Sequence, residues 1–164
     1  MIFQKNKHNI SLYNTLLNLS RNLFFYNKIT LNDSFETRIY LMLTHFSIIL
    51  IIFKNQNIKF PQNLYDDLFF CIENDLRELG HGDVSVNKKM KDINKVLYDI
   101  LLKLKSEKNN FKINKDLIYK YFNEFNNLNI TKYKLFDEYL VKFYHFCFEL
   151  SPETMIQDAI KFKV

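Results

Sequence analysis

IYLMLTHFSIILIIF, residues 39–53, is the most apolar stretch of this 164-residue chain. A helix that spans a bilayer needs about 20 mostly apolar residues, whereas this run is shorter and is interrupted by Thr44, His45 and Ser47. The stretch therefore predicts a helix at the centre of a packed core. The alternative that it leaves open is a segment that dips into a membrane.

Helical signals continue on the N-terminal side of this stretch. Asp33 or Ser34 fits the N-cap position of the central helix, which we expect to end near residue 54. Ser11 fits the N-cap of an earlier helix over 11–26. The apolar residues at helical spacing on that first helix are Leu12, Leu16, Leu19 and Leu23.

Helical periodicity also recurs on the C-terminal side, and strand signals are nearly absent. The polar stretches KNQNIKF and KSEKNNFKIN interrupt the helical pattern. Between them we predict one helix from Pro61 to Leu79 and one that Ser85 caps, with an apolar stripe from Val86 to Leu104. After the second break we predict helices over 115–126 and 132–150 and a short helix that begins at Pro152. We therefore predict an all-α fold, a single domain over residues 1–164 with six or seven helices around one core.

Composition sets the class of protein but not its function. A hydrophobic content of 48% with 16% aromatic residues predicts a folded chain. The net charge of +5 is compatible with an acidic or membrane-surface partner, and no basic run is dense enough to indicate DNA binding. The start of the chain, MIFQKNKHNISLYN, lacks the pattern of a signal peptide or presequence, so we expect a cytoplasmic location.

No set of residues predicts a metal centre, a cofactor site or a catalytic group. Cys71 and Cys147 match no zinc or redox spacing and lie in apolar helical patterns, which indicates free buried thiols. The four histidines are scattered along the chain. No nucleophile with a base and an orienting partner can be assembled from these residues.

Four polar side chains fall where helical periodicity places apolar ones. Arg21 leans inward on the first helix, and Arg38 and His45 share a face of the central helix. Asp75 lies on the apolar stripe of the third helix, which consists of Leu64, Leu68, Ile72, Leu76 and Leu79. Buried charges require partners, so we predict an internal polar network in which Asp75 pairs with Arg21 or Arg38. The network either fixes helix register or lines a groove.

NDLRELGHGDVSVNKKMK, residues 74–91, holds both glycines of the chain. Gly80 stands where a helix end favours a left-handed residue, and Ser85 can cap the helix that follows. Lys88 and Lys89 would then lie in the first turn of that helix, where cations oppose the helix dipole. The corner is either a structural turn or a surface for an anionic partner, and it lacks the spacing of a nucleotide-binding loop.

The sequence around this corner resembles the signature of a known protein family. LYDDLFFCIENDLRELGHGDVSVNKKMK, residues 64–91, resembles the signature of the ubiquinol–cytochrome c chaperone family, and the similarity covers residues 12–98. The matching positions are Asp75, Leu76, Arg77, Glu78, Gly80, Gly82, Asp83, Lys88, Lys89, Met90 and Lys91, with Arg21, Tyr26, Asp33, Arg38 and His45 upstream. One departure is Tyr98-Asp99-Ile100, where family members usually continue with Y-G-R.

The resemblance implies a non-enzymatic assembly factor for respiratory complex III that binds newly made cytochrome b, together with a second small factor at the membrane-associated ribosome. Because the start of the chain lacks the pattern of a mitochondrial presequence, the chain looks more like a bacterial member of the family, which would work in the cytoplasm, peripheral at the inner membrane. The recognition face would be Arg77, Glu78, Gly80, Gly82, Asp83, Lys88, Lys89, Met90 and Lys91. The polar network would be Arg21, Asp33, Arg38, His45 and Asp75.

Two other classes of function remain open on the residues alone. One is a small-anion or nucleotide-responsive enzyme that uses the glycine corner. The other is a membrane-surface or anion-binding helical scaffold without a cytochrome client, which the positive charge and the aromatic content favour.

Overall fold

The computed structural model describes residues 11–107, 110–127 and 130–164, so the prediction about the first ten residues lies outside the described part. The described residues form seven α-helices, which confirms the all-α prediction. These are α1 (Ser11–Ser20), α2 (Phe35–Asn55), α3 (Gln62–Glu78), α4 (Asp83–Lys103), α5 (Lys115–Tyr121), α6 (Ile130–Phe148) and α7 (Pro152–Asp158). Short π or 3-10 turns occur at Phe24–Lys28, Asn123–Asn127 and Ala159–Lys161.

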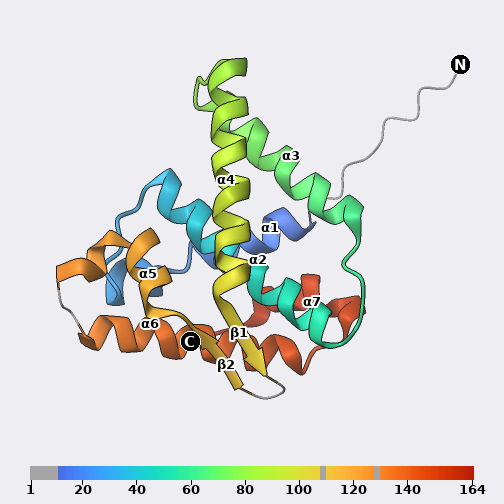
Figure 1. Cartoon of the computed structure of the whole chain (residues 1–164), viewed down its shortest axis with the longest axis vertical. Helices are drawn as coiled ribbons and strands as arrows, with labels where there is room; N and C mark the ends of the chain where they lie inside the picture. Colours follow the sequence, from blue (N-terminus) through green and yellow to red (C-terminus); the bar gives the residue numbers. More distant parts are fainter. Residues whose placement is uncertain (1–10, 108–109, 128–129) are drawn as a thin grey trace, which may run out of the picture.

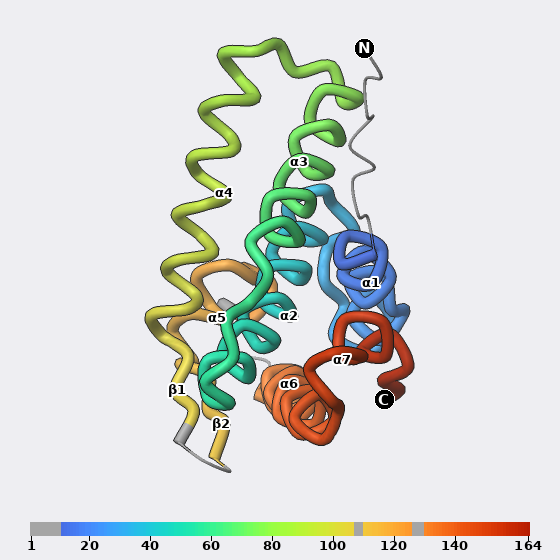
Figure 2. Tube along the Cα trace, turned by 90° about the vertical axis from the view of Figure 1, so that its right-hand side faces the viewer, coloured from blue at the N-terminus to red at the C-terminus, as the bar shows by residue number. Residues whose placement is uncertain are grey.

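The predicted central helix is α2, and its position in the core is confirmed. The Ser34 hydroxyl caps it by accepting a hydrogen bond from the Thr37 amide at 3.2 Å. Figure 2 shows α4 on one side of α2 and α1 on the other, and α6 also packs against it. By length and composition α2 could cross a membrane, but 72% of its most apolar 18-residue stretch is buried inside the protein. A core helix of a folded domain accounts for this burial.

The first helix is shorter than predicted, because it ends at Ser20 and not near residue 26. The Ser20 hydroxyl donates to the Leu17 carbonyl at 2.7 Å, and a π-helical turn follows. The wider register of that turn buries Phe25 against the ring of Tyr139, with the ring centroids 4.8 Å apart. As a consequence Leu23, which we expected on the apolar stripe, is 67% exposed.

A β-hairpin occupies most of the second predicted polar break. Strand β1 (Leu104–Glu107) pairs antiparallel with β2 (Asn110–Ile113), so that Leu104 faces Ile113. Phe111 is buried and stacks on Tyr144 of α6, with the ring centroids 4.7 Å apart. Two strands of four residues give too short an alternation to recognise among lysines and asparagines.

Helices α3 and α4 form an antiparallel pair whose joined ends project beyond the rest of the chain (Figure 1). Leu68, Ile72 and Leu76 of α3 are buried, as the predicted stripe requires, whereas Leu79 is 58% exposed. Of the two cysteines, which are both free, Cys147 is buried as expected and Cys71 is only half-buried.

Candidate functional site

The corner between α3 and α4 is closed by backbone hydrogen bonds. The His81 amide donates to the Leu76 carbonyl at 3.2 Å, and the Gly80 amide donates to the Arg77 carbonyl at 3.0 Å. This pair of bonds is a Schellman motif, which places a left-handed residue just after the helix. Gly80 has φ +93°, so the predicted role of this glycine is confirmed.

The next helix begins earlier than predicted. Gly82 is the N-cap of α4, and Ser85 is already helical, with its hydroxyl 3.0 Å from Nδ1 of His81. The prediction that Ser85 caps the helix is therefore wrong. Lys88 and Lys89 lie in the second turn of α4 and not in the first. Because the helix dipole acts within the first turn, the predicted opposition between these lysines and the dipole does not arise.

Arg77 connects the two helices across the corner. Its Nη2 donates to Glu73 Oε1 at 2.9 Å, and its Nη1 forms an ion pair with Asp83 at the start of α4. These hydrogen bonds, first the one that Arg77 donates to Asp83, raise the pKa of Arg77 above its ordinary value. Arg77 and Asp83, which we predicted as partner-binding residues, thus fix the geometry of the corner.

The side chains exposed at the corner include apolar and basic ones, beside the acidic Glu78 and Asp83. Leu79 is 58% and Val84 85% exposed. Lys88 and Lys91 are exposed, and neither has a hydrogen bond or ion pair within the described residues. Val84, Lys88 and Lys91 follow the i, i+4, i+7 spacing of one helix face. We call Leu79, Val84, Lys88 and Lys91 the corner surface; Lys89 and Met90 are half-buried beside it.

A cavity of about 320 Å³ opens between α1, α2 and α3, next to the corner. Its floor is apolar and consists of Leu17, Phe35, Ile39 and Met42. Its charged lining consists of Arg21, Arg38, Asp75 and Glu78, and Leu79 connects it to the corner surface. We call this cavity the mixed-charge groove. It brings together three residues of the predicted network, Arg21, Arg38 and Asp75, with Glu78 of the predicted recognition face.

The predicted pairing of Asp75 with an arginine is wrong. Asp75 Oδ2 accepts a hydrogen bond from the Tyr13 hydroxyl at 2.6 Å. Burial raises the pKa of Asp75, and the hydrogen bond from Tyr13 opposes that shift. Burial and Asp75 also raise the pKa of Tyr13, so the phenol remains the donor. Tyr13 was missed because an isolated tyrosine on a helix gives no signal of its partner.

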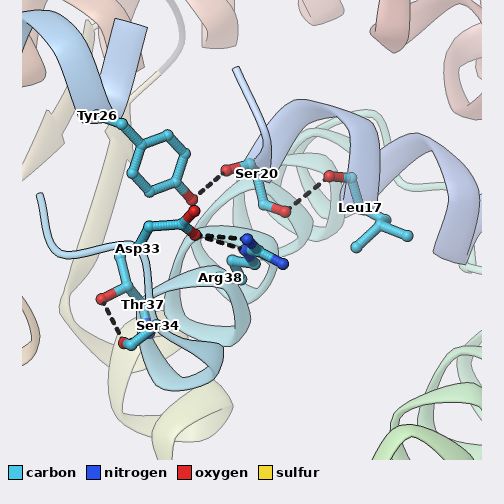
Figure 3. Close-up of polar contacts among 7 residues, drawn as sticks. All are labelled: Leu17, Ser20, Tyr26, Asp33, Ser34, Thr37 and Arg38. Atoms are coloured by element: carbon cyan, nitrogen blue, oxygen red, sulfur yellow. Dashed lines mark hydrogen bonds and ion pairs between the residues drawn. The ribbon is translucent and has the colours of Figure 1, made fainter. Parts of the chain in front are cut away.

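Arg38 pairs instead with the predicted network residue Asp33, as Figure 3 shows. Its Nε and Nη2 donate to Asp33 Oδ1 at 2.8 and 2.6 Å, and these bonds raise the pKa of Arg38. The Tyr26 hydroxyl lies beside this pair and donates to the Ser20 carbonyl at 2.7 Å. The Tyr26 contact ties the end of α1 to the π-helical turn, and the Asp33–Arg38 pair stabilises the start of α2 at one side of the groove.

Arg21 and Glu78 differ from these paired residues. Both side chains are exposed, and neither has a hydrogen bond or ion pair in the part of the chain that the structure describes. Arg21 acts on Asp75 only through space, by lowering its pKa. Within the described residues, the groove therefore presents an unpaired cation just after α1 and an unpaired anion at the end of α3.

His45 does not belong to this network. It is fully buried in the core, where Nδ1 lies 2.7 Å from the Leu41 carbonyl and Nε2 lies 2.8 Å from the Tyr139 hydroxyl. Burial lowers its pKa to about 4, so the ring is neutral near pH 7. Although Arg38 and His45 share a helix face, α2 runs from the groove into the core between them.

Asp99, at the position where the chain departs from the Y-G-R pattern, has a structural role. It accepts hydrogen bonds from Lys103 at 2.7 Å, from Lys120 at 2.8 Å and from the Tyr121 hydroxyl. These bonds hold its pKa well below the ordinary range for a carboxyl group. Asp99 therefore attaches α5 to α4.

Among the described residues, no group of three or more His, Cys, Asp or Glu side chains is arranged to hold a metal ion. A family model described as ubiquinol-cytochrome C chaperone matches residues 27–117, which include α2, α3, α4 and the whole corner. Comparison with curated proteins and with solved structures returned no match.

Proposed function

The chain belongs to the ubiquinol-cytochrome C chaperone family, and from this premise we propose that it binds newly made cytochrome b during the assembly of ubiquinol–cytochrome c reductase. Family membership supports the coarser role, a chaperone in complex III assembly, and favours a binding function over an enzymatic one. The finer role, capture of cytochrome b, is supported by the corner surface.

The observation that carries this proposal is an exposed apolar and basic surface on a rigid support. Burying Leu79 or Val84 against a client would contribute about 1.5–3 kcal/mol each. Lys88 and Lys91 add positive charge that can pair with acidic groups of the client. Because Arg77 already fixes the backbone of the corner, binding costs little further conformational entropy.

The other partners follow from the family resemblance. They are a second small assembly factor, the ribosome that makes the client, and the inner membrane of a bacterial cell, where the chain would be peripheral. An apolar client that emerges at a membrane is a reason for a chaperone to work there.

The second candidate function is a membrane-surface or anion-binding scaffold without a cytochrome client. The outer face of α4 favours it, because Tyr98 and Leu102, at 59% and 84% exposure, continue the face that carries Lys91 and Lys95. The nucleotide-responsive alternative loses its basis, which was a pair of lysines in the first turn of a helix.

Reversing charge on the corner surface tests the proposal. Cells expressing the tagged protein are lysed in mild detergent, and cytochrome b is measured in the purified fraction. The double variant K88E/K91E should fold normally and lose most of the cytochrome b. The control K134E/K142E makes the same charge change at exposed lysines of α6 and should retain it.

Retention of cytochrome b by K88E/K91E would count against the corner surface. Absence of cytochrome b from the wild-type fraction, together with normal complex III and normal haem b spectra in a deletion strain, would exclude the proposed function. Binding of the wild type to anionic vesicles in that case would support the scaffold.

A further inference from the structure

We propose that the mixed-charge groove binds a polypeptide segment of the client that carries an apolar side chain between an acidic and a basic residue. This inference rests on the proposed function and names the chemistry of the bound segment. The acidic group would lie toward Arg21 and Arg38, and the basic group toward Asp75 and Glu78.

The first argument is that opposite charges line the groove without pairing with one another. Asp75 is bonded to Tyr13, and Arg38 is bonded to Asp33. Arg21 and Glu78 have no side-chain partner in the described ranges. A network that only fixed helix register would gain by pairing these groups directly, since unpaired charges contribute nothing to it. The unpaired charges are instead available to a bound molecule.

The second argument is the separation of the two signs. The cations come from the end of α1 and the start of α2, whereas both anions come from α3. Asp75 and Glu78 are three residues apart, so they share one face of α3. A ligand with a single sign of charge would meet attraction on one wall and repulsion on the other. A segment with both signs is complementary to both walls.

The third argument is the apolar floor and its continuity with the corner surface. Covering Leu17 and Phe35, the half-buried residues of the floor, with an apolar side chain would contribute to the affinity, and the charges would set orientation. Leu79 borders both the groove and the corner surface. A client held on the corner surface can therefore extend directly into the groove.

The walls are held in place before anything binds. Asp33 holds the guanidinium of Arg38, and the Tyr13 hydroxyl holds the carboxylate of Asp75. The Tyr26 contact ties α1 to the π-helical turn beside the Asp33–Arg38 pair, as Figure 3 shows. Such preorganisation lowers the entropy lost on binding, because few side chains must be ordered.

The test uses overlapping synthetic peptides that tile the cytochrome b made by the same organism, with binding measured by fluorescence anisotropy. The variants are R21E, E78K and the double exchange R21E/E78K. Matched controls are K134E and E138K, at exposed positions of α6 that have no ion pair in the described part of the chain. Because Arg21 and Glu78 have no side-chain partner among the described residues, we expect the variants to remain folded, and thermal unfolding checks this.

We expect at least one peptide with an apolar centre and charges of both signs to bind the wild type and both controls. Each single charge reversal should lower the affinity for that peptide about fivefold or more, since an attractive contact becomes repulsive. R21E/E78K should prefer the same peptide with its acidic and basic residues exchanged. That reversal of preference is specific to a segment lying across both walls.

Equal affinity of the wild type, R21E and E78K for every bound peptide would overturn the inference, as would the lack of any bound peptide. Binding of the wild type to phosphatidylethanolamine vesicles alone, lost in R21E, would assign the groove to a zwitterionic headgroup and also overturn it. Capture of whole cytochrome b through Lys88 and Lys91 in either case would leave the proposed function standing.

Discussion

At the scale of single residues, the two glycines of the corner have different roles. Gly80 is left-handed at φ +93°, whereas Gly82 has φ −77° and stands at the N-cap of α4. An added Cβ meets no neighbour within 4 Å at either position. Backbone conformation alone therefore decides what a side chain does at each site.

The same substitution should act with opposite sign at these positions. G80S should lower the free energy of unfolding by about 1–2 kcal/mol, because a side chain in the left-handed region is strained. G82S should raise it by a few tenths of a kcal/mol, because serine is a better N-cap than glycine. Urea unfolding of the three proteins measures both effects, and equal midpoints for G80S and G82S would contradict the assignment.

His45 predicts a pH dependence of stability. Its pKa is lowered to about 4 in the folded state, below the ordinary value of 6.5, so the unfolded chain binds more protons between these values. Stability therefore falls as the pH is lowered from about 6.5 to about 4, by roughly 3 kcal/mol for this group.

The variant H45Q isolates this contribution, because glutamine keeps polar atoms near Leu41 and Tyr139 but does not titrate. Unfolding free energies of both proteins are measured between pH 4 and 7, and their difference is plotted against pH. The free energy of unfolding of the wild type should fall relative to that of H45Q as the pH is lowered. A constant difference would show that His45 is not buried in the neutral form.

At the scale of elements, the sequence predicts the apolar interiors of helices better than their ends. The stripe Leu68, Ile72 and Leu76 is buried as predicted, because one face of a regular helix meets the core. The end of α1 depends on where Phe25 can pack against Tyr139, a residue from α6. No local pattern contains that long-range contact, so the π-helical turn could not be predicted.

Asp99 predicts a local change in the attachment of α5. D99N removes the charge that holds Lys103 and Lys120, and exchange of amide hydrogens in α5 should accelerate. The global free energy of unfolding should fall by about 1 kcal/mol, because the ion pairs are partly exposed. The control D92N removes a charge from the same helix, α4. Asp92 makes only a loose ion pair there, with Lys95 Nζ 3.8 Å from its Oδ1.

Hydrogen exchange followed by mass spectrometry measures this effect segment by segment. D92N should leave α5 unchanged. Equal protection of α5 in D99N and the wild type would show that apolar packing of Leu117 and Ile118 suffices to hold the helix.

In the whole molecule, the residues that line the groove could be predicted from the sequence, but their hydrogen-bond partners could not. Periodicity identified Arg21, Arg38 and Asp75 as polar residues on inward-leaning faces, and all three meet at the groove. It could not decide their partners, because Tyr13 carries no charge and Asp33 also fits the N-cap position of the central helix. The pairing of Asp75 with Tyr13 depends on how α3 packs against α1, which the spacing within one helix does not contain.

The buried position of α2 predicts that the core stays closed at a membrane surface. Cys147 lies on α6, which packs against α2; its thiol is fully buried, and burial raises its pKa to about 12. If α2 left the core to enter a bilayer, the face of α6 that carries Cys147 would be uncovered. In C71S, which retains only this thiol, reaction with a thiol reagent at pH 8 should remain slow when anionic vesicles are added, and become fast only in denaturant. Vesicle-induced labelling of Cys147 at the denatured rate would show instead that α2 leaves the core and dips into the membrane.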